Sequence, residues 1–372
     1  MDRLREFFET GPRRRSVIGL VAVVVLLSVA VSPIRTRLLQ ALALSDTSVP
    51  EPTASALPSA SPTDPGAGRG PILVFPSSSN EFPSPSPSPS GQNRQGGGGR
   101  RGYVIAAAGD IACNGGGSGR SECDQAGTAA VLARLKGLDA VLPLGDNQYE
   151  SGRLSEYQGA YDRTWGRFKG ISHPVPGNHD YDSGGEGYFA YFGGQAGNPG
   201  AGYYSFDLGG WHLVALNSNC GAIGGCGRGS PQERWLRDDL AHHSKRCTLA
   251  YWHHPRFSSG VEHGSTPEMQ AIWQALYEHD AEIVLSGHEH NYERFAPQDS
   301  VGHADPRKGI REFVVGTGGR NHYGLGRRIA NSQVGNDSSF GVLRLTLLSK
   351  SYGWKFIAAT GSFTDSGRDT CH

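Results

Sequence analysis

The segment Ile283-Val284-Leu285-Ser286-Gly287-His288-Glu289-His290 places two histidines one residue apart, directly after an apolar run. Three apolar residues followed by Ser-Gly are typical of a short buried strand and the turn that ends it. In an extended segment or tight turn, His288 and His290 can project the same way, towards two metal ions that lie side by side. Taken alone, the segment is equally compatible with a histidine-rich surface loop.

Three further apolar runs also end in a residue that can bind a metal ion. They are residues 103–108 before Asp110, residues 140–144 before Asp146, and residues 247–252 before His253. A helical pattern from Val131 to Leu138 separates the first two runs, and this order predicts a βαβ unit and a partly parallel sheet in an α/β fold. An aspartate after glycine is, by itself, more typical of a turn or a helix cap. Because ligand sites of open α/β sheets lie at the carboxyl ends of the strands, we expect the four strand ends to converge.

The remaining segments of the second half predict additional strands and helices. A Gly-Gly pair between residues 203–208 and 211–216 predicts a hairpin. Ser230-Pro231 and Thr266-Pro267 are typical helix starts, with a cap residue followed by proline. Three late apolar runs are expected to close a second sheet, and they are residues 313–315, 340–348 and 352–358.

The first hundred residues predict no folded domain. Residues 1–15 form a basic N-terminus, and residues 16–32 are almost entirely apolar. Because a positive flank stays in the cytoplasm, we expect 16–32 to be a signal anchor or signal peptide that places the rest of the chain outside. We favour an anchor, with cleavage after residues 41–43 and secretion as the alternative. Residues 33–101 are rich in Pro, Ser and Gly and predict a disordered linker, which leaves 102–372 as the folded domain.

Charge and cysteine content narrow the function classes. Lys+Arg and Asp+Glu both number 35, so there is no electrostatic case for a nucleic-acid partner. All six cysteines follow residue 110, and an even number on the exported side favours disulfides. Six cysteines allow fifteen pairings, and a zinc-cysteine site is the alternative, although the chain has no Cys-x-x-Cys. The short spacings suggest the pairs Cys113–Cys123 and Cys220–Cys226, which leaves Cys247 with Cys371.

Five segments, taken in order, resemble the five sequence blocks of the calcineurin-like metallophosphoesterases. They are Asp110-Ile111-Ala112, Gly145-Asp146-Asn147-Gln148-Tyr149, Gly177-Asn178-His179-Asp180, Tyr251-Trp252-His253 and Gly287-His288-Glu289-His290. The resemblance spans about residues 103–372 and is closest to the purple acid phosphatase branch. It implies a four-layer α/β/β/α sandwich of two mixed sheets flanked by helices.

Two positions carry the branch assignment. Most of the superfamily has a metal-binding histidine two residues after the first aspartate, where this chain has Ala112. Tyr149, three residues after Asp146, matches the position at which purple acid phosphatases supply a tyrosinate instead. A phenolate stabilises a hard trivalent ion such as Fe(III). A buried aromatic residue is the alternative interpretation of Tyr149, and the branch usually has glycine where Ala112 stands.

The resemblance also implies two metal ions, Fe(III) and a divalent Zn, Mn or Fe. The first would be bound by Asp110, Asp146, Tyr149 and His290. The second would be bound by Asp146, Asn178, His253 and His288, so that Asp146 bridges the two ions. The family places this ligand two residues before a proline, which selects His253 and leaves His254 as a structural or solvent-facing residue.

By the same resemblance we expect an exported phosphatase that hydrolyses phosphomonoesters by attack of a metal-bound hydroxide. Its substrate would be a small-molecule phosphate ester. His179 is expected to approach the phosphate or protonate the leaving oxygen, Asp180 to orient His179, and His263 to lie on the substrate side. The alternatives are a phosphodiesterase or nucleotidase of the same superfamily, or a cell-surface binding module without turnover. The sequence does not predict the oligomeric state.

Overall fold

A computed structural model of the chain describes residues 102–114 and 123–372. The segments expected to form the basic N-terminus, the apolar anchor and the linker (residues 1–15, 16–32 and 33–101) therefore lie outside the described residues. Within the described ranges, no helix is both long enough and apolar enough to cross a membrane.

A five-stranded sheet contains the predicted βαβ unit. Strands β1 (Tyr103–Ala108) and β2 (Leu138–Pro143) pair in parallel, and α3 (Gln125–Arg134) connects them. The other pairings in this sheet are antiparallel, and its strand order is β12-β11-β10-β1-β2. The remaining strands are β10 (Gly341–Leu347), β11 (Ser351–Ala358) and β12 (Ser366–Thr370).

A seven-stranded sheet has the order β3-β4-β5-β6-β8-β7-β9. Strands β4, β5, β6 and β8 run in parallel, whereas the predicted hairpin β3–β4 and the strand β7 are antiparallel to their neighbours. The bounds are β3 (Tyr204–Leu208), β4 (Trp211–Ala215), β5 (Cys247–Tyr251), β6 (Ile283–Ser286), β7 (Tyr292–Phe295), β8 (Arg311–Val315) and β9 (Ser332–Asn336).

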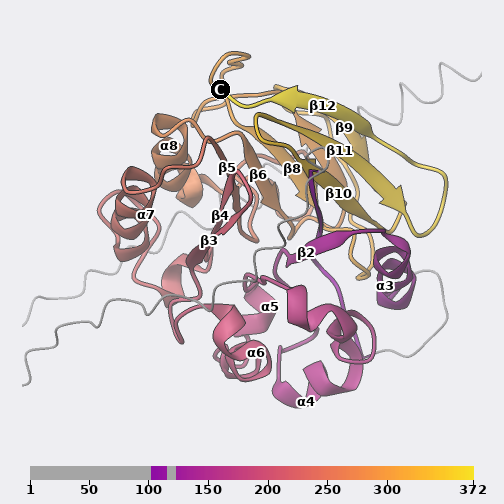
Figure 1. Cartoon of the computed structure of the whole chain (residues 1–372). Helices are drawn as coiled ribbons and strands as arrows, with labels where there is room; N and C mark the ends of the chain where they lie inside the picture. The colour runs from indigo at the N-terminus through magenta and orange to yellow at the C-terminus, as the bar shows by residue number, and fades with distance from the viewer. Residues whose placement is uncertain (1–101, 115–122) are drawn as a thin grey trace, which may run out of the picture. The chain divides into compact units, whose positions relative to one another are not determined.

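Two amphipathic helices, α7 (Pro231–Ala241) and α8 (Gln270–Glu278), pack together beside β4–β6 (Figure 1). The predicted start of α7 is confirmed, because the Ser230 hydroxyl accepts from the backbone N–H of Glu233. Shorter helical segments complete the domain. They are α4 (Leu154–Glu156), α5 (Asn178–Tyr181), α6 (Glu186–Phe192), η1 (Tyr157–Tyr161), η2 (Trp165–Ile171), η3 (Gly193–Ala196), η4 (Cys220–Ala222) and η5 (Pro267–Met269).

The two sheets share one apolar core. Buried side chains of β1 and β10, such as Ile105 and Leu343, belong to the same cluster as Leu249 and Leu285 of β5 and β6. A second cluster lies between the seven-stranded sheet and α7 and α8. The predicted sandwich of two mixed sheets with flanking helices is therefore confirmed, and Figure 1 shows α3 on the side of β2 and β10.

Two details of the predicted architecture are wrong. The late strands were expected to lie together in one sheet, but β8 pairs with β6 whereas β10 and β11 extend the sheet of β1. The helical pattern from Val131 to Leu138 also covers two elements. The helix ends at Arg134, Gly137 turns the chain with φ 65°, and Leu138 begins β2.

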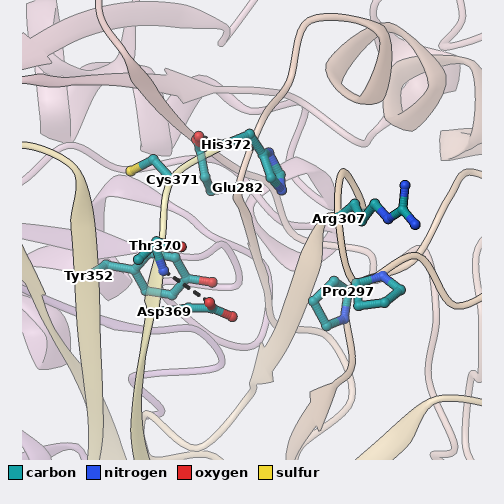
Figure 2. A pocket seen from close by; sticks show the side chains of 10 residues that line it. Glu282, Pro297, Arg307, Tyr352, Asp369, Thr370, Cys371 and His372 are labelled. Atoms are coloured by element: carbon teal, nitrogen blue, oxygen red, sulfur yellow. Dashed lines mark hydrogen bonds and ion pairs between the residues drawn. The ribbon is translucent and has the colours of Figure 1, made fainter.

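All three predicted disulfides are present: Cys113–Cys123, Cys220–Cys226 and Cys247–Cys371. The last one joins the first residue of β5 to the segment after β12, and so links the two sheets covalently. Cys371 also lines a small cavity of about 120 Å³ together with the buried Glu282 and the exposed His372, and Figure 2 shows these three side chains.

Candidate metal centre

The predicted ligands come from strand ends of both sheets. Asp110 and Asp146 follow β1 and β2 of the five-stranded sheet, whereas His253 and His288 follow β5 and β6 of the seven-stranded sheet. Asp110, Asp146 and His288 have φ values of 60°, 46° and 70°, a left-handed conformation that non-glycine residues seldom adopt. Backbone strain of this kind is typical of functional sites, where the surrounding structure holds a side chain in one direction.

The residue before Asn178 is Gly177, and the structure shows why no larger side chain fits there. A Cβ atom on Gly177 would lie 2.1 Å from Oδ1 of Asp146, which is closer than any real contact. The backbone of the turn therefore approaches the carboxylate directly, and the backbone N–H of His179 donates to Asp146 Oδ1 over 2.9 Å. Glycine is required here because the two ligand-bearing turns touch.

Three side chains surround the hydroxyl of Tyr149. Its oxygen lies 3.0 Å from Asp110 Oδ1, 3.0 Å from Asp146 Oδ2 and 3.0 Å from His290 Nε2. One hydroxyl proton can satisfy only one of these partners. Ligand atoms bound at right angles about 2.1 Å from an ion lie about 3.0 Å apart, so the spacing fits an octahedral cation at the centre of the group.

The charge state of Tyr149 would depend on whether a cation is bound beside it. Burial raises the pKa of the phenol well above its ordinary value, and the neighbouring Asp110 and Asp146 carboxylates raise it further. A phenolate between two carboxylates is therefore unstable without a compensating positive charge. A trivalent ion supplies that charge, which fits the predicted tyrosinate ligand.

His290 is fixed by contacts that sequence reasoning missed. Its Nδ1 bonds the carbonyl oxygen of Asn321 over 2.7 Å, which leaves Nε2 for the metal group. The ring of Tyr323 stacks on the His290 ring at 3.8 Å between centroids. Both residues lie in the Gly-rich segment after β8. Their position after the end of a strand is the sequence feature that could have indicated them.

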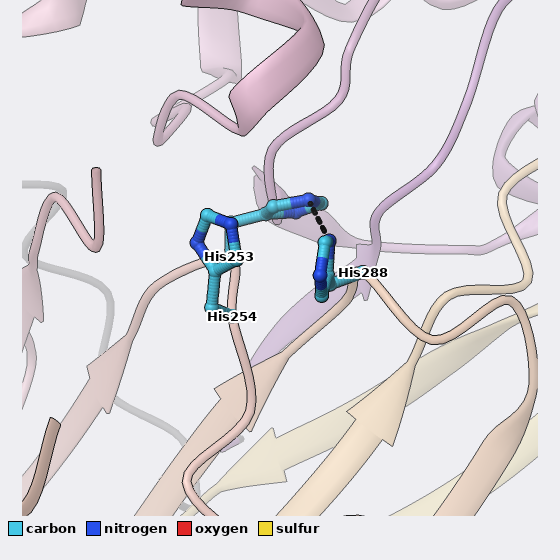
Figure 3. A group of neighbouring side chains, drawn as sticks. All are labelled: His253, His254 and His288. Carbon is cyan, nitrogen blue, oxygen red and sulfur yellow. Dashed lines mark hydrogen bonds between the residues drawn. The ribbon is translucent and has the colours of Figure 1, made fainter. Parts of the chain in front are cut away.

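A second group adjoins the first through Asp146. Nε2 of His253 lies 3.3 Å from Asp146 Oδ2 and 3.2 Å from Nδ1 of His288. His253 Nδ1 bonds the Leu144 carbonyl oxygen over 2.9 Å, so its Nε2 is the atom aimed at the group. Figure 3 shows the two rings with their facing nitrogens. Two imidazole nitrogens at this separation share one proton or bind one cation.

Asn178 gives an independent sign of a cation in this second group. Its Oδ1 is buried and has no hydrogen-bond partner among the described residues. Leaving a buried acceptor unsatisfied costs about 1–3 kcal/mol, and coordination to a metal removes that cost. Asn178, His253, His288 and the shared Asp146 therefore fit a second metal ion of the Zn or Mn type, for which imidazole and oxygen ligands are suited.

The residues of the second group differ in the direction in which their pKa values are shifted. Burial alone would raise the pKa of Asp146, but the neighbouring His253, His179 and His288 lower it well below its ordinary value. Burial lowers the pKa of His253, yet Asp146 outweighs this and brings it to about 9. Burial and the neighbouring His253 hold the pKa of His288 far below its usual range, so His288 presents a neutral ring.

His254 lies closer to the group than a solvent-facing residue would. Its ring centroid is 4.3 Å from that of His288, and Figure 3 shows the two rings together with His253. The Ser218 hydroxyl lies 2.8 Å from Nδ1 of His254. Burial lowers the pKa of His254 to about 3, with His253 adding to the effect, so the ring is neutral.

A family model described as calcineurin-like phosphoesterase matches residues 103–292, just over half of the 372 residues. The chain belongs to the calcineurin-like phosphoesterase family. Its curated relatives include purple acid phosphatase 15 of Arabidopsis thaliana, 34% identical over 37% of this chain and 29% of that protein. Acid phosphatase type 7 of Homo sapiens is 28% identical over 43% of this chain and 41% of its own length.

The phosphoesterase fold recurs in solved structures. A purple acid phosphatase from yellow lupin (Lupinus luteus) seeds has a TM-score of 0.58 at 19% identity, covering 72% of this chain and 53% of the other. The Plasmodium protein GAP50, an anchor in the inner membrane complex, has a TM-score of 0.54 at 13% identity, covering 73% and 90%. The chain spans about a third of the length of the first curated relatives that it matches.

Several of the curated relatives are named purple acid phosphatases, which is the branch that the sequence resembles. Relatives of this type imply a dinuclear metal centre, and the two groups around Asp146 are the part of this structure that fits one. Tyr149, which contacts the shared Asp146, is the residue on which the sequence-based branch assignment rested. The identity of each ion stays a prediction.

His179 and His263 both border the metal centre of the phosphoesterase. The His179 ring lies 4.5 Å from that of Tyr149, and the His263 ring stacks on His288 at 4.1 Å. Nδ1 of His179 bonds the carbonyl oxygen of Glu150 over 2.6 Å and lies 3.1 Å from Asp182 Oδ2. The positions are those that the sequence predicted, whereas the roles are not tested by position alone.

Asp180 does not orient His179, contrary to the sequence-based expectation. Its carboxylate accepts from the backbone N–H of Gly177, from Asn147 and from the Tyr157 hydroxyl at 2.6 Å. Burial and the nearby Asp146 raise the pKa of Asp180 to about 6. The side chain points back into its own turn, so Asp180 holds the two ligand-bearing loops together, and Asp182 takes the place beside His179.

Proposed function

We propose that this phosphoesterase is a dinuclear metal-dependent phosphatase that hydrolyses small phosphomonoesters. The observation that carries the proposal is the pair of donor groups that share Asp146. One group consists of oxygen donors and a single imidazole around Tyr149, and the other of two imidazoles and the amide of Asn178. This asymmetry suits a trivalent iron beside a divalent zinc, manganese or iron.

The two ions, when bound, polarise the phosphoryl group and supply a nucleophile near neutral pH. The residues of this chain set where that happens. Asp110, Tyr149 and His290 would hold the first ion, and Asn178 with His253 and His288 the second. Leu144 and Asn321 orient two of the imidazoles through their carbonyl oxygens, so that the correct nitrogen faces each ion.

Three imidazoles outside the proposed ligand set border the metal centre. The His179 ring contacts that of Tyr149, and the rings of His254 and His263 contact that of His288. The Ser218 oxygen accepts from the backbone N–H of His254, so its hydroxyl proton is free to donate to Nδ1. Nε2 of the neutral His254 ring then carries a proton that can be donated. Three potential donors favour a monoester, which presents three terminal oxygens, over a diester with two.

An open groove of about 410 Å³ adjoins the second group. Its lining includes Asn178, Asp182, Asn219 and His254. We place the leaving alcohol in this groove. His179 adjoins it through Asp182. Because the Glu150 carbonyl accepts from Nδ1, Nε2 is the free nitrogen, and in the protonated ring Nε2–H can transfer its proton to the departing oxygen and leave His179 neutral.

We also propose that residues 102–372 act outside the cytoplasm, tethered by the apolar segment 16–32 through the linker 33–101. The three disulfides support an oxidising location for this domain. The chain has no charge excess that would favour a nucleic-acid partner.

Metal analysis combined with rates on matched aryl esters tests the proposed function. The purified full-length protein should contain at least two metal ions per chain and hydrolyse 4-nitrophenyl phosphate with a higher kcat/KM than bis(4-nitrophenyl) phosphate. A higher kcat/KM on the diester would assign the protein to the diesterases. Two bound ions without hydrolysis of either ester would favour a binding module instead.

A further inference from the structure

A second cluster of metal-capable side chains lies at the other end of the seven-stranded sheet. Asp207 is near the end of β3, His212 is the second residue of β4, and His243 follows α7. The metal centre lies beyond the carboxyl ends of β5 and β6, which are parallel to β4, whereas this cluster lies where β4 begins. One ligand atom from each of the three residues lies within 4.8 Å of the others.

The three side chains are already oriented towards one another. His212 Nδ1 lies 3.0 Å from Asp207 Oδ1, and His243 Nδ1 lies 3.8 Å from the same oxygen. The imidazole rings stack with 3.4 Å between their centroids. His212 is only 4% exposed, so this arrangement is part of the folded structure rather than a chance surface contact.

The other nitrogen of His212 has the partner that metal-binding histidines usually have. Its Nε2 lies 2.8 Å from Asp239 Oδ2, and the Ser205 hydroxyl donates to Asp239 Oδ1 over 2.7 Å. A carboxylate on the far nitrogen fixes the tautomer and makes the near nitrogen a better ligand. A carboxylate that holds a histidine, whose other nitrogen faces a possible metal position, is the arrangement found around many zinc ions.

Ion pairing alone accounts poorly for His243. The Lys245 ammonium lies 3.3 Å from Asp207 Oδ2 and already balances that carboxylate. Two stacked imidazoles cannot both be protonated, since each would face the other's charge. His243 therefore adds a nitrogen donor to the cluster that the Asp207–Lys245 ion pair does not need.

We propose that Asp207, His212 and His243 bind a divalent transition-metal ion of the zinc type, separate from the dinuclear centre. Ligands about 2.0–2.1 Å from a tetrahedral ion lie about 3.3 Å apart, and the separations of 3.0 Å and 3.8 Å from Asp207 Oδ1 to the two imidazole nitrogens bracket that value. The side chain of Asp207 is 46% exposed, so water can fill the fourth position.

The bound ion would join the edge of the sheet to its covering helix. Its ligands come from both strands of the β3–β4 hairpin and from the segment that connects α7 to β5. Because β3 is the terminal strand of the seven-stranded sheet, its attachment depends on β4 and on such cross-links. Metal binding therefore stabilises the fold without touching the reaction.

Zinc counting on matched variants tests the site. Full-length protein with its dinuclear centre filled is equilibrated with excess Zn²⁺ and desalted, and zinc and iron are measured per chain. His242 serves as the control, because it precedes His243 but is 78% exposed and contacts only Asp238 in its own helix. Wild type and His242→Ala should each retain one metal ion more than His243→Ala, with the same kcat on an aryl phosphate.

A second readout keeps the test decisive if one variant folds poorly. Added Zn²⁺ should raise the Tm of wild type and of His242→Ala, but not of His243→Ala or Asp207→Asn, because only a folded site gains from the ion. Equal metal counts and equal zinc-dependent Tm shifts in all variants would show that the cluster is an ion-pair network only, and would overturn the proposal.

Discussion

Replacing Tyr149 by phenylalanine removes one atom from the centre of the first donor group. The hydroxyl oxygen lies 3.0 Å from each of two carboxylate oxygens and from Nε2 of His290, whereas the ring is buried. Phenylalanine fills the same space without the oxygen. The change therefore deletes a ligand and leaves the packing of the core intact.

The size of the effect follows from these contacts. Removing an outer partner of a ligand typically weakens metal binding about 10–100-fold, so loss of the ligand itself should cost at least about 100-fold in iron affinity. In the metal-free protein the hydroxyl donates to a carboxylate, and such a hydrogen bond contributes about 1.5–3 kcal/mol. Tyr149→Phe should therefore lower the free energy of unfolding of the metal-free protein by ~2 kcal/mol.

Visible absorption and denaturant unfolding measure the two effects separately. Iron-loaded wild type should show a tyrosinate-to-Fe(III) band, which Tyr149→Phe abolishes. Tyr161→Phe is the matched control, since Tyr161 is also buried and stacks edge-on against Tyr157 in the core. A wild type that is fully active with iron yet colourless, or a band that survives in Tyr149→Phe, would refute the assignment of Tyr149 as a ligand.

Three further changes test other parts of the site and the fold. Asn178→Ala should empty the second metal position while the iron band persists, so unchanged hydrolysis and metal content would contradict the ligand set. His179→Ala should lower kcat on an aryl phosphate by about 10²–10⁴-fold with metal content unchanged, and loss of metal instead would make His179 a ligand. Burial raises the pKa of Glu282 to about 8, so the folded state keeps a proton that the unfolded state loses above about pH 4.5. The free energy of unfolding should fall by up to ~1.4 kcal/mol per pH unit between these values, and Glu282→Gln should flatten that slope in urea titrations.

The sequence predicted that the candidate metal ligands come together, because these residues follow strand ends. Asp110, Asp146, His253 and His288 each stand directly after an apolar run, and the βαβ pattern orders the first two. What the pattern could not show is which of the two sheets supplies each ligand. Sheet membership depends on which strands pair over long sequence distances, as β10 does with β1, and local periodicity carries no such information.

The partners of the ligands were harder to predict than the ligands. Asp180 stands beside His179 in the sequence, but the short helix α5 turns its carboxylate towards Gly177 and Tyr157. Asp182, two residues further on, faces the histidine instead, because residues one turn apart on a helix lie on the same side. Helix α5 has only four residues and therefore gives no periodic signal in the sequence.

The zinc-type cluster was not predicted because its members are separated by turns and a helix. Asp207 and His212 flank the Gly-Gly hairpin, and His243 follows only after α7. None of the three occurs in a metal-binding spacing. Only the folded hairpin and the end of α7 bring these side chains together.

Asp146 tests the central claim, two metal positions joined by a shared carboxylate, most directly. Its Oδ2 lies 3.0 Å from the Tyr149 hydroxyl in one group and 3.3 Å from Nε2 of His253 in the other. Asp146→Asn should lose both metal ions, the iron band and the hydrolysis of 4-nitrophenyl phosphate together, while Asp139→Asn, a change on β2 outside the centre, should keep all three. Retention of two ions and of wild-type hydrolysis in Asp146→Asn would contradict the shared centre.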